Sequence, residues 1–432
     1  MNILFKYFSL IFVTQLFVPV YAMTANKEEI ASEEHQVVAS DGTELNFVRY
    51  PSTGDYLLIW IAPGYGIHER SIQTAQRVAA KGIEIWQIDL AEALFLPNST
   101  EQMRAFTGKY VADLIEAAHR ETGKKIILSA RSYGAIPLLR GARTWQTRKP
   151  EKAYLVGAIL FSPDLYTTVP SLGVDPEYLP IASATNIPIT ILQDGRRGNR
   201  WYVNRLIDTL NSGGSKTTLK ILPGVSALFF SDDDAPETLK AITNLPDDIV
   251  SSIHSMDKLP SSTTAAPMQK QFRSVGSGID NRLKPFKGNF LPYPIELKDA
   301  AGKTYKRENF QGQITIVNFW ASWCPPCVTE IPSLNRLREQ MQGTPFELIS
   351  VNYAESPAKI TEFLKKVDVH FPVLLDETGQ VSVGWKVIAF PSTFIIGADG
   401  KIHYGVNAAI HWDSPDVVAV IKKLYEKTEK SR

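Results

Sequence analysis

The two cysteines of this 432-residue chain lie in a single motif, Cys324-Pro325-Pro326-Cys327. The motif follows an apolar strand predicted over 315–319 and begins a helix predicted from about 325 to 340. Unpaired N–H groups and the helix dipole at a helix N-terminus favour the thiolate form of Cys324. Cys327, one turn further on, is then placed to resolve a mixed disulfide. The motif therefore predicts a redox-active pair, with half of a metal site or a buried structural pair as the alternatives.

Composition excludes several classes of protein. Lys and Arg number 46 against 45 Asp and Glu, so the net charge of +1 gives no reason to expect a nucleic-acid partner. Two thiols form neither a disulfide framework nor an ordinary four-ligand zinc site. We predict no metal and no cofactor. At roughly 150 residues per domain, the length indicates two or three globular domains.

Residues 1–22 read as a signal peptide. Lys6 precedes an apolar run over 7–18, and the small-residue end at Ala22 predicts cleavage there. An uncleaved anchor is the alternative, but the run is shorter than the roughly 20 residues that a membrane span needs, and no later stretch is long enough. We expect a mature protein without a membrane span in the periplasm, where a reducing dithiol needs an outside electron source.

Beyond this segment the pattern divides the chain into two α/β units. Apolar strands alternate with helical segments over 36–250, which predicts a doubly wound parallel sheet with helices on both faces. Residues 251–289 are poor in large apolar groups and read as a linker, and a second α/β domain follows over 290–428. In the first unit the predicted strands are 57–61, 83–88, 125–129, 156–161 and 187–192, and the predicted helices are 71–81, 100–122 and 201–211.

Three segments of the second unit carry a family resemblance: NFWASWCPPC (318–327), EIP (330–332) and FPSTF (390–394). They resemble the TlpA/ResA branch of extracytoplasmic thioredoxin-like disulfide reductases over about residues 286–428. The resemblance implies that Pro391 is cis, packs beside Cys324 and offers its flanking backbone as a docking edge for substrate. It also implies that a membrane thiol electron donor resets the oxidised pair.

The same resemblance gives Glu330 a role. Thioredoxins proper carry a buried Asp where this chain has Asn318, and Asn cannot shuttle a proton. Glu330 matches a carboxylate that this branch places near the dithiol, and partial burial raises the pKa of such a group so that it accepts the proton of Cys327. The alternative is a helix-surface Glu that favours the first turns of the helix.

Residues 129–134 (SARSYG) follow a predicted strand and precede a helix, as a nucleophile elbow does, with Ala130 in place of the first glycine. Together with the loop 62–66 (APGYG), they resemble the α/β-hydrolase fold over about residues 40–245. The resemblance makes Ser132 the nucleophile. The loop 222–230, where the family's histidine would lie, contains none.

A serine hydrolase needs a base and an orienting acid. His68 is the alternative base, and Asp194 or Asp164 the acid. We therefore expect a noncatalytic scaffold that recognises the substrate protein, while the linker sets its effective concentration beside the dithiol.

These observations predict an extracytoplasmic thiol–disulfide oxidoreductase that acts as a reductase. Its partners would be a disulfide-containing substrate protein and a membrane thiol electron donor. Two alternatives remain: a secreted serine esterase or peptidase with an accessory redox domain, and a binding protein whose dithiol is a redox sensor.

Overall fold

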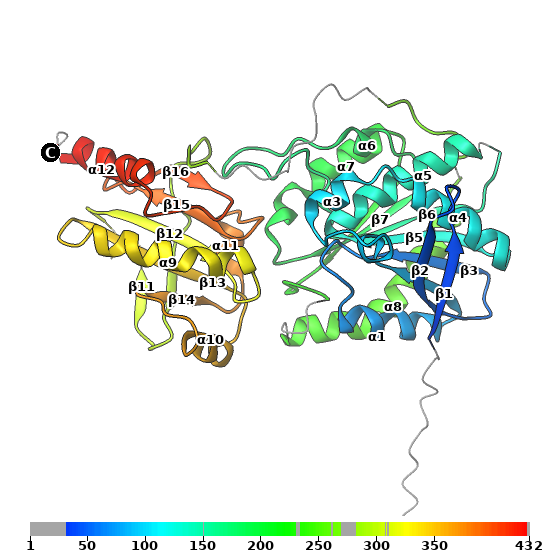
Figure 1. Cartoon of the computed structure of the whole chain (residues 1–432), viewed down its shortest axis with the longest axis horizontal. Coiled ribbons are helices and arrows are strands. Elements are labelled where there is room, and N and C mark those ends of the chain that lie inside the picture. The colour runs from blue at the N-terminus through cyan, green and yellow to red at the C-terminus, as the bar shows by residue number, and fades with distance from the viewer. Residues whose placement is uncertain are drawn as a thin grey trace, which may run out of the picture.

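The computed structural model describes residues 32–149, 151–229, 234–260, 262–268, 282–306, 308 and 311–429. The predicted signal peptide lies outside these residues, as does the central part of the predicted linker, 269–281. Figure 1 shows a mixed α/β chain with a sheet in each half.

The N-terminal half is built on an eight-stranded sheet in the order β1-β2-β4-β3-β5-β6-β7-β8. The neighbours from β4 through β3 to β8 pair in parallel, as predicted. The prediction of a parallel sheet is wrong at one edge, where β2 runs antiparallel to both β1 and β4. The strands are β1 (Glu33–Val38), β2 (Glu44–Tyr50), β3 (Tyr56–Ile61), β4 (Ile83–Ile88), β5 (Lys125–Arg131), β6 (Leu155–Phe161), β7 (Ile189–Asp194) and β8 (Thr217–Leu222).

Helices cover both faces of this sheet, which is why β4, β6 and β7 are buried along their whole length. Side chains of α1 and α8 form the apolar core on one face, and those of α4, α5 and α7 form it on the other. The helices are α1 (Glu69–Ala79), α2 (Leu90–Ala93), α3 (Thr100–Ala105), α4 (Lys109–Thr122), α5 (Ala135–Arg148), α6 (Pro180–Ser183), α7 (Val203–Ser212) and α8 (Pro236–Met256).

The helix predicted over 100–122 is two helices, α3 and α4, separated at Gly108. Gly108 has a φ of 93°, a conformation that residues with a Cβ rarely adopt. A Cβ at this position would lie 2.3 Å from the backbone carbonyl carbon of Arg140 in α5. The close approach of two backbones therefore explains both the glycine and the break.

The C-terminal half contains a six-stranded sheet in the order β14-β13-β12-β15-β16-β9, with the hairpin β10–β11 beside it. β12, β13 and β14 are parallel, whereas β15, β16 and β9 continue the sheet in antiparallel pairs. The elements are β9 (Lys284–Pro285), β10 (Glu296–Lys298), β11 (Thr304–Lys306), β12 (Ile314–Trp320), α9 (Pro325–Gln340), β13 (Phe346–Tyr353), α10 (Pro357–Leu364), β14 (Val373–Asp376), α11 (Gln380–Gly384), β15 (Ser392–Ile396), β16 (Ile402–Val406) and α12 (Pro415–Glu429).

The described parts of the predicted linker belong to the two folded halves. Residues 251–256 are the last turns of α8, and β9 pairs with β16. Side chains of α5 also bind backbone carbonyls of Ser262 and Ala266. The described ends of this segment are therefore held by ordered contacts.

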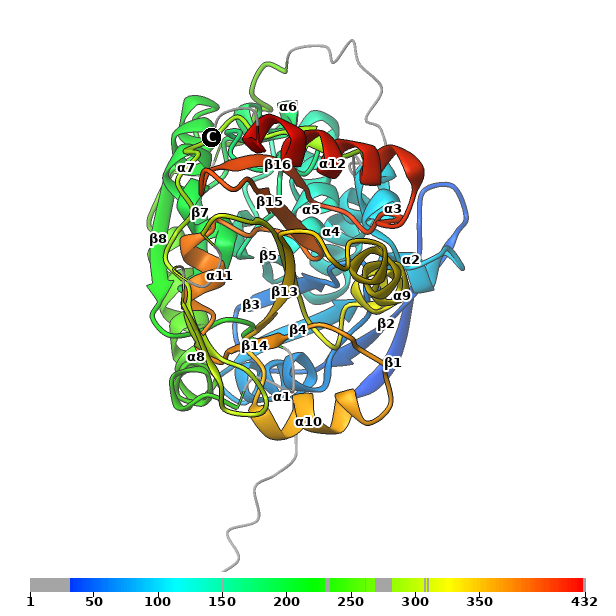
Figure 2. The same ribbon diagram turned by 90° about the vertical axis from the view of Figure 1, so that its left-hand side faces the viewer.

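The two halves contact one another directly. Leu172 is 7% exposed and belongs to the apolar core of the C-terminal sheet, beside Phe394 and Val387. Trp201 donates its indole N–H to the Val383 carbonyl at 2.7 Å. Seen along the long axis, the C-terminal elements lie in front of the N-terminal sheet (Figure 2).

Candidate functional site

The dithiol lies at the carboxyl end of β12, where α9 begins. Cys324 is the N-cap of α9, and its sulfur accepts the backbone N–H of Cys327 at 3.3 Å. The two cysteines form a disulfide with Cα atoms 5.3 Å apart, and both are buried. Pro325 and Pro326 occupy the first helical positions, where a proline loses no intrahelical hydrogen bond. The sequence thus places the pair at the helix N-terminus, as predicted.

Glu330 is buried in the same helix, 3% exposed, which excludes the helix-surface alternative. Its two carboxyl oxygens accept hydrogen bonds from Asn318 Nδ2 at 2.7 Å and from Trp412 Nε1 at 3.0 Å. Burial raises the pKa of Glu330 to about 7, although these donors and the backbone of Ile410 act in the opposite direction. A carboxyl group with this pKa both takes up and releases protons near neutral pH.

The Pro391 loop lies beside the dithiol strand. The Phe390–Pro391 peptide bond is cis, as the family resemblance implied, and the next residue, Ser392, pairs with Phe319 of β12. The Phe390 ring packs against the apolar cluster that contains both cysteines. It also makes an edge contact with Trp323, at 5.8 Å between ring centroids.

Glu355, which the sequence analysis missed, holds the loop before the dithiol. Its buried carboxylate accepts the backbone N–H of Ser322 at 2.7 Å and the Ser322 hydroxyl at 2.5 Å. Asn352 and Lys359 also donate to it. Its position two residues after the end of β13 could have indicated this role, because polar groups at the carboxyl ends of neighbouring parallel strands meet at one edge.

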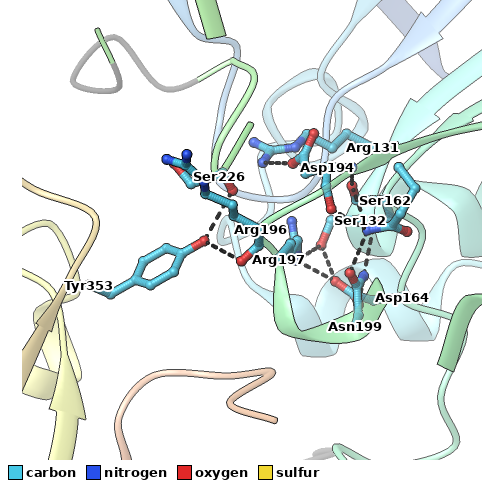
Figure 3. A network of polar contacts seen from close by, with 11 residues as sticks. Arg131, Ser132, Ser162, Asp164, Asp194, Arg196, Arg197, Asn199, Ser226 and Tyr353 are labelled. Carbon is cyan, nitrogen blue, oxygen red and sulfur yellow. Dashed lines mark hydrogen bonds and ion pairs between the residues drawn. The ribbon is translucent and has the colours of Figure 1, made fainter. Parts of the chain in front are cut away.

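Ser132 lies on a sharp turn between β5 and α5, as a nucleophile elbow does, with a φ of 51°. Its hydroxyl donates to Asp164 at 2.6 Å, and Arg197 Nη2 lies 2.6 Å from the same carboxylate oxygen and 3.3 Å from the hydroxyl (Figure 3). Asn199 donates to the other Asp164 oxygen at 3.0 Å. Each of these side chains is therefore paired within the cluster.

Two further candidate hydrolase residues, Asp194 and His68, lie beside Arg131, the residue that precedes Ser132. Asp194 forms an ion pair with Arg131 at 3.3 Å, and burial raises the pKa of Asp194 against the opposing charge of that arginine. His68 caps α1 and lines a small cavity with Arg131. Burial lowers the pKa of His68, and the positive charge of Arg131 lowers it further.

The side-chain partners of Ser132 are Arg197 and Asp164, one of the two candidate acids, and neither His68 nor Asp194 is among them. An arginine cannot act as a general base, because its guanidinium stays protonated in proteins. In this cluster the acceptor of the Ser132 hydroxyl is the Asp164 carboxylate, which Arg197 and Asn199 also bind.

The carboxyl edges of the two sheets face each other. Tyr353, the last residue of β13, places its hydroxyl 3.2 Å from the Arg196 carbonyl oxygen and 3.3 Å from that of Ser226. Arg196 follows β7 and Ser226 follows β8. Ser132 follows β5 and the dithiol follows β12, so each lies at the carboxyl end of a strand in one of these two sheets.

Two kinds of site were not found among the residues that the structure describes: a membrane-spanning helix and a metal-binding cluster. No helix among these residues is long and apolar enough to cross a bilayer. The same residues also contain no group of three or more His, Cys, Asp or Glu side chains arranged to hold a metal ion.

The C-terminal half is similar to known proteins. The model of the AhpC/TSA family matches residues 289–405. Sporulation thiol-disulfide oxidoreductase A of Bacillus subtilis is 32% identical over 115 residues, which are 26% of this chain and 69% of that protein. The chain belongs, through its C-terminal half, to the thiol-disulfide oxidoreductase family. This half is a thioredoxin-like domain.

Other members of the thiol-disulfide oxidoreductase family match over a shorter share of their length. ResA of Bacillus thuringiensis subsp. konkukian is 34% identical over 104 residues, or 24% of this chain and 60% of ResA. ResA of Bacillus subtilis is 34% identical over 106 residues, which are 24% of this chain and 59% of that protein. The crystal structure of StoA from Bacillus subtilis matches at 25% identity with a TM-score of 0.27, over 31% of this chain and 97% of StoA. The chain thus spans about three fifths of the ResA proteins it matches.

Proposed function

We propose that this chain is an extracytoplasmic thiol–disulfide oxidoreductase that reduces protein disulfides, with a noncatalytic α/β-hydrolase-like N-terminal domain that recognises the substrate. One observation carries the redox assignment: the Cys324–Cys327 disulfide caps α9 while Glu330, buried in the next turn, has a pKa near 7. A dithiol and a proton carrier in one helix are what disulfide exchange requires.

In the proposed reaction the Cys324 thiolate attacks one sulfur of a substrate disulfide. A mixed disulfide forms, and the other substrate sulfur leaves as a thiolate that takes a proton from water. Glu330 then accepts the proton of the Cys327 thiol, and the Cys327 thiolate attacks the sulfur of Cys324. The Cys324–Cys327 disulfide forms again and the second substrate sulfur leaves, taking the proton back from Glu330.

Each cycle therefore passes two electrons to the substrate, with one proton from Cys327 and one from water, and leaves the enzyme oxidised. A thiol electron donor in the membrane would return two electrons to the pair. The segment 1–22, with its apolar run and small-residue end, supports export to the periplasm, where such a donor is required.

The proposed N-terminal role rests on the contacts of Ser132. Its turn between strand and helix supports the α/β-hydrolase likeness, whereas Arg197 beside the hydroxyl weighs against hydrolysis. A scaffold that has lost catalysis still offers a surface for recognition.

Trapping of the mixed disulfide tests the redox assignment. Cys327→Ala keeps the attacking sulfur and removes the resolving one. It should therefore accumulate a mixed disulfide with a disulfide-containing protein, and dithiothreitol should reduce this complex and release the two proteins. The matched variant Cys324→Ala keeps one thiol but should form no such complex. Equal trapping by both variants, or by neither, would refute the assigned roles.

Labelling with a fluorophosphonate tests the N-terminal assignment. We expect no covalent labelling of the wild-type protein beside a reactive control hydrolase, because the carboxylate that accepts the Ser132 hydroxyl is held in an ion pair with Arg197 and no histidine is among the side-chain partners of Ser132. Labelling that disappears in Ser132→Ala would contradict a noncatalytic domain and would support the bifunctional alternative.

A further inference from the structure

Tyr353 joins the two halves of the chain at the edge where the dithiol lies. The residue is 6% exposed, and its hydroxyl shares its proton between the carbonyl oxygens of Arg196 and Ser226 (Figure 3). A buried phenol hydroxyl requires such an acceptor, because an unpaired one loses its hydration without compensation. Both acceptors belong to the N-terminal half.

The ring of Tyr353 contacts the proposed docking edge. It packs against Phe390 with 4.9 Å between centroids, and Phe390 in turn contacts Trp323, the residue before Cys324. On another side the ring meets Gly379, where a Cβ would lie 2.9 Å from ring atom Cε2. The ring therefore lies between a close backbone and the residue that precedes Pro391.

The N-terminal loop that binds Tyr353 is itself held in place. Arg197 follows Arg196 and forms the ion pair with Asp164 at 2.6 Å. Gly198 approaches the C-terminal half so closely that a Cβ would lie 1.6 Å from the Val387 carbonyl oxygen. The polar cluster around Ser132 thus anchors the carbonyl group that Tyr353 binds.

We propose that Tyr353 is a positioning residue through which the N-terminal domain holds the Phe390–Pro391 edge in the conformation that binds a protein substrate. This inference rests on the proposed disulfide reductase function. The hydroxyl fixes the ring, the ring supports Phe390, and Phe390 precedes the backbone on which an extended substrate segment would dock. A small disulfide that reaches the sulfur without this edge should not depend on Tyr353.

The full-length Tyr353→Phe variant tests the proposal, because it removes the hydroxyl and leaves the ring. We expect its KM for insulin disulfides to rise about three- to tenfold, the effect of one hydrogen bond. Its kcat with insulin, its rate of reaction with the small disulfide dithiobis(nitrobenzoate) and the reduction potential of the dithiol should not change. The matched control is Tyr56→Phe, since Tyr56 bonds Asp257 at 2.8 Å at the start of β3. The control should keep the wild-type KM.

Amide hydrogen exchange at 390–393 gives a readout that does not need turnover. Exchange there should be faster in Tyr353→Phe than in the wild type and Tyr56→Phe. If the wild type fails to reduce insulin, the proposed reductase function is refuted. The positioning role of Tyr353 is then tested by amide hydrogen exchange at 390–393 alone. Unchanged exchange overturns it, and so does an unchanged KM in an active variant. An equal loss of rate with both disulfides would also overturn it, as a general structural defect.

Discussion

At the scale of single residues, two buried carboxylates differ in their partners. Glu330 and Asp164 are both 3% exposed, whereas the Arg197 side chain beside Asp164 is 19% exposed. Asn318 and Trp412 offer Glu330 neutral donors, so its proton stays mobile. Arg197 forms an ion pair with Asp164, which holds both side chains in place in their charged forms. Neutral donors therefore suit proton transfer, whereas the ion pair suits a structural role.

Glu330→Gln should remove a pH dependence of stability from the oxidised protein. The folded-state pKa of about 7 lies above the ordinary value of 4.5, so this group favours folding below about pH 4.5 and loses that contribution as pH rises through 7. The wild type should lose on the order of 3 kcal/mol of unfolding free energy relative to the variant over this range. Urea titrations at several pH values would measure the difference, and parallel curves would contradict the assignment.

The same variant should slow disulfide exchange. Loss of a positioned proton acceptor costs on the order of a hundredfold in rate. We expect this loss near pH 7 in the resolving step, measured as decay of the mixed disulfide by rapid quenching. A rate of decay equal to that of the wild type would end the proposed role of Glu330.

Removal of Asp164 should destabilise the N-terminal half far more than removal of Ser132. Asp164→Ala leaves the Arg197 charge without its carboxylate, at a cost of about 3 to 5 kcal/mol. Ser132→Ala removes one neutral hydrogen-bonding group, at a cost of about 1 kcal/mol. Chemical denaturation of both variants would measure these values, and similar losses would argue against a structural ion pair.

At the scale of elements, the sequence predicted the dithiol unit well because its signals are local. The apolar run of β12 and the prolines after Cys324 define a strand and a helix start within a residue of those observed. The pairing of β2 and the break at Gly108 depend instead on neighbours that are distant in sequence. Glu355 escaped notice for the same reason, since its partner Ser322 lies on another element.

Glu355→Ala should loosen the turn that precedes the dithiol. The Ser322 N–H and hydroxyl lose their common acceptor, so the free energy of unfolding should fall by about 2 to 3 kcal/mol. Lys359→Ala removes only a partly exposed ion pair with the same carboxylate and should cost at most about 1 kcal/mol. Thermal unfolding compares the two variants, and an equal effect would mean that the ion pair matters more than the turn.

At the scale of the whole molecule, the two halves form a packed interface that composition could not predict. From the sequence we expect a linker that sets the effective concentration of one domain beside the other, and in the structure the contacts of Leu172, Trp201 and Tyr353 also join the two halves directly. An isolated leucine or tyrosine in a loop carries no signal of its distant partner. The recognition role proposed for the N-terminal half therefore depends on contact as well as on tethering.

Leu172→Ala should weaken the C-terminal half although the residue belongs to the N-terminal one. Truncation of a buried leucine costs about 2 to 5 kcal/mol, and the loss should appear as faster hydrogen exchange in β15 and β16. Leu239, which is 45% exposed, supplies the control Leu239→Ala, expected to change stability by less than about 0.5 kcal/mol. Unchanged exchange in the C-terminal sheet would show that the interface adds no stability.

We expect the Cys324–Cys327 pair to turn over as a protein disulfide reductase. We would measure insulin disulfides reduced per molecule of mature protein with excess dithiothreitol as the electron source, using Cys324→Ser to subtract the uncatalysed reaction. We predict many turnovers that depend on Cys324. Reduction of no more than one disulfide per protein molecule would contradict this prediction and would favour a redox sensor.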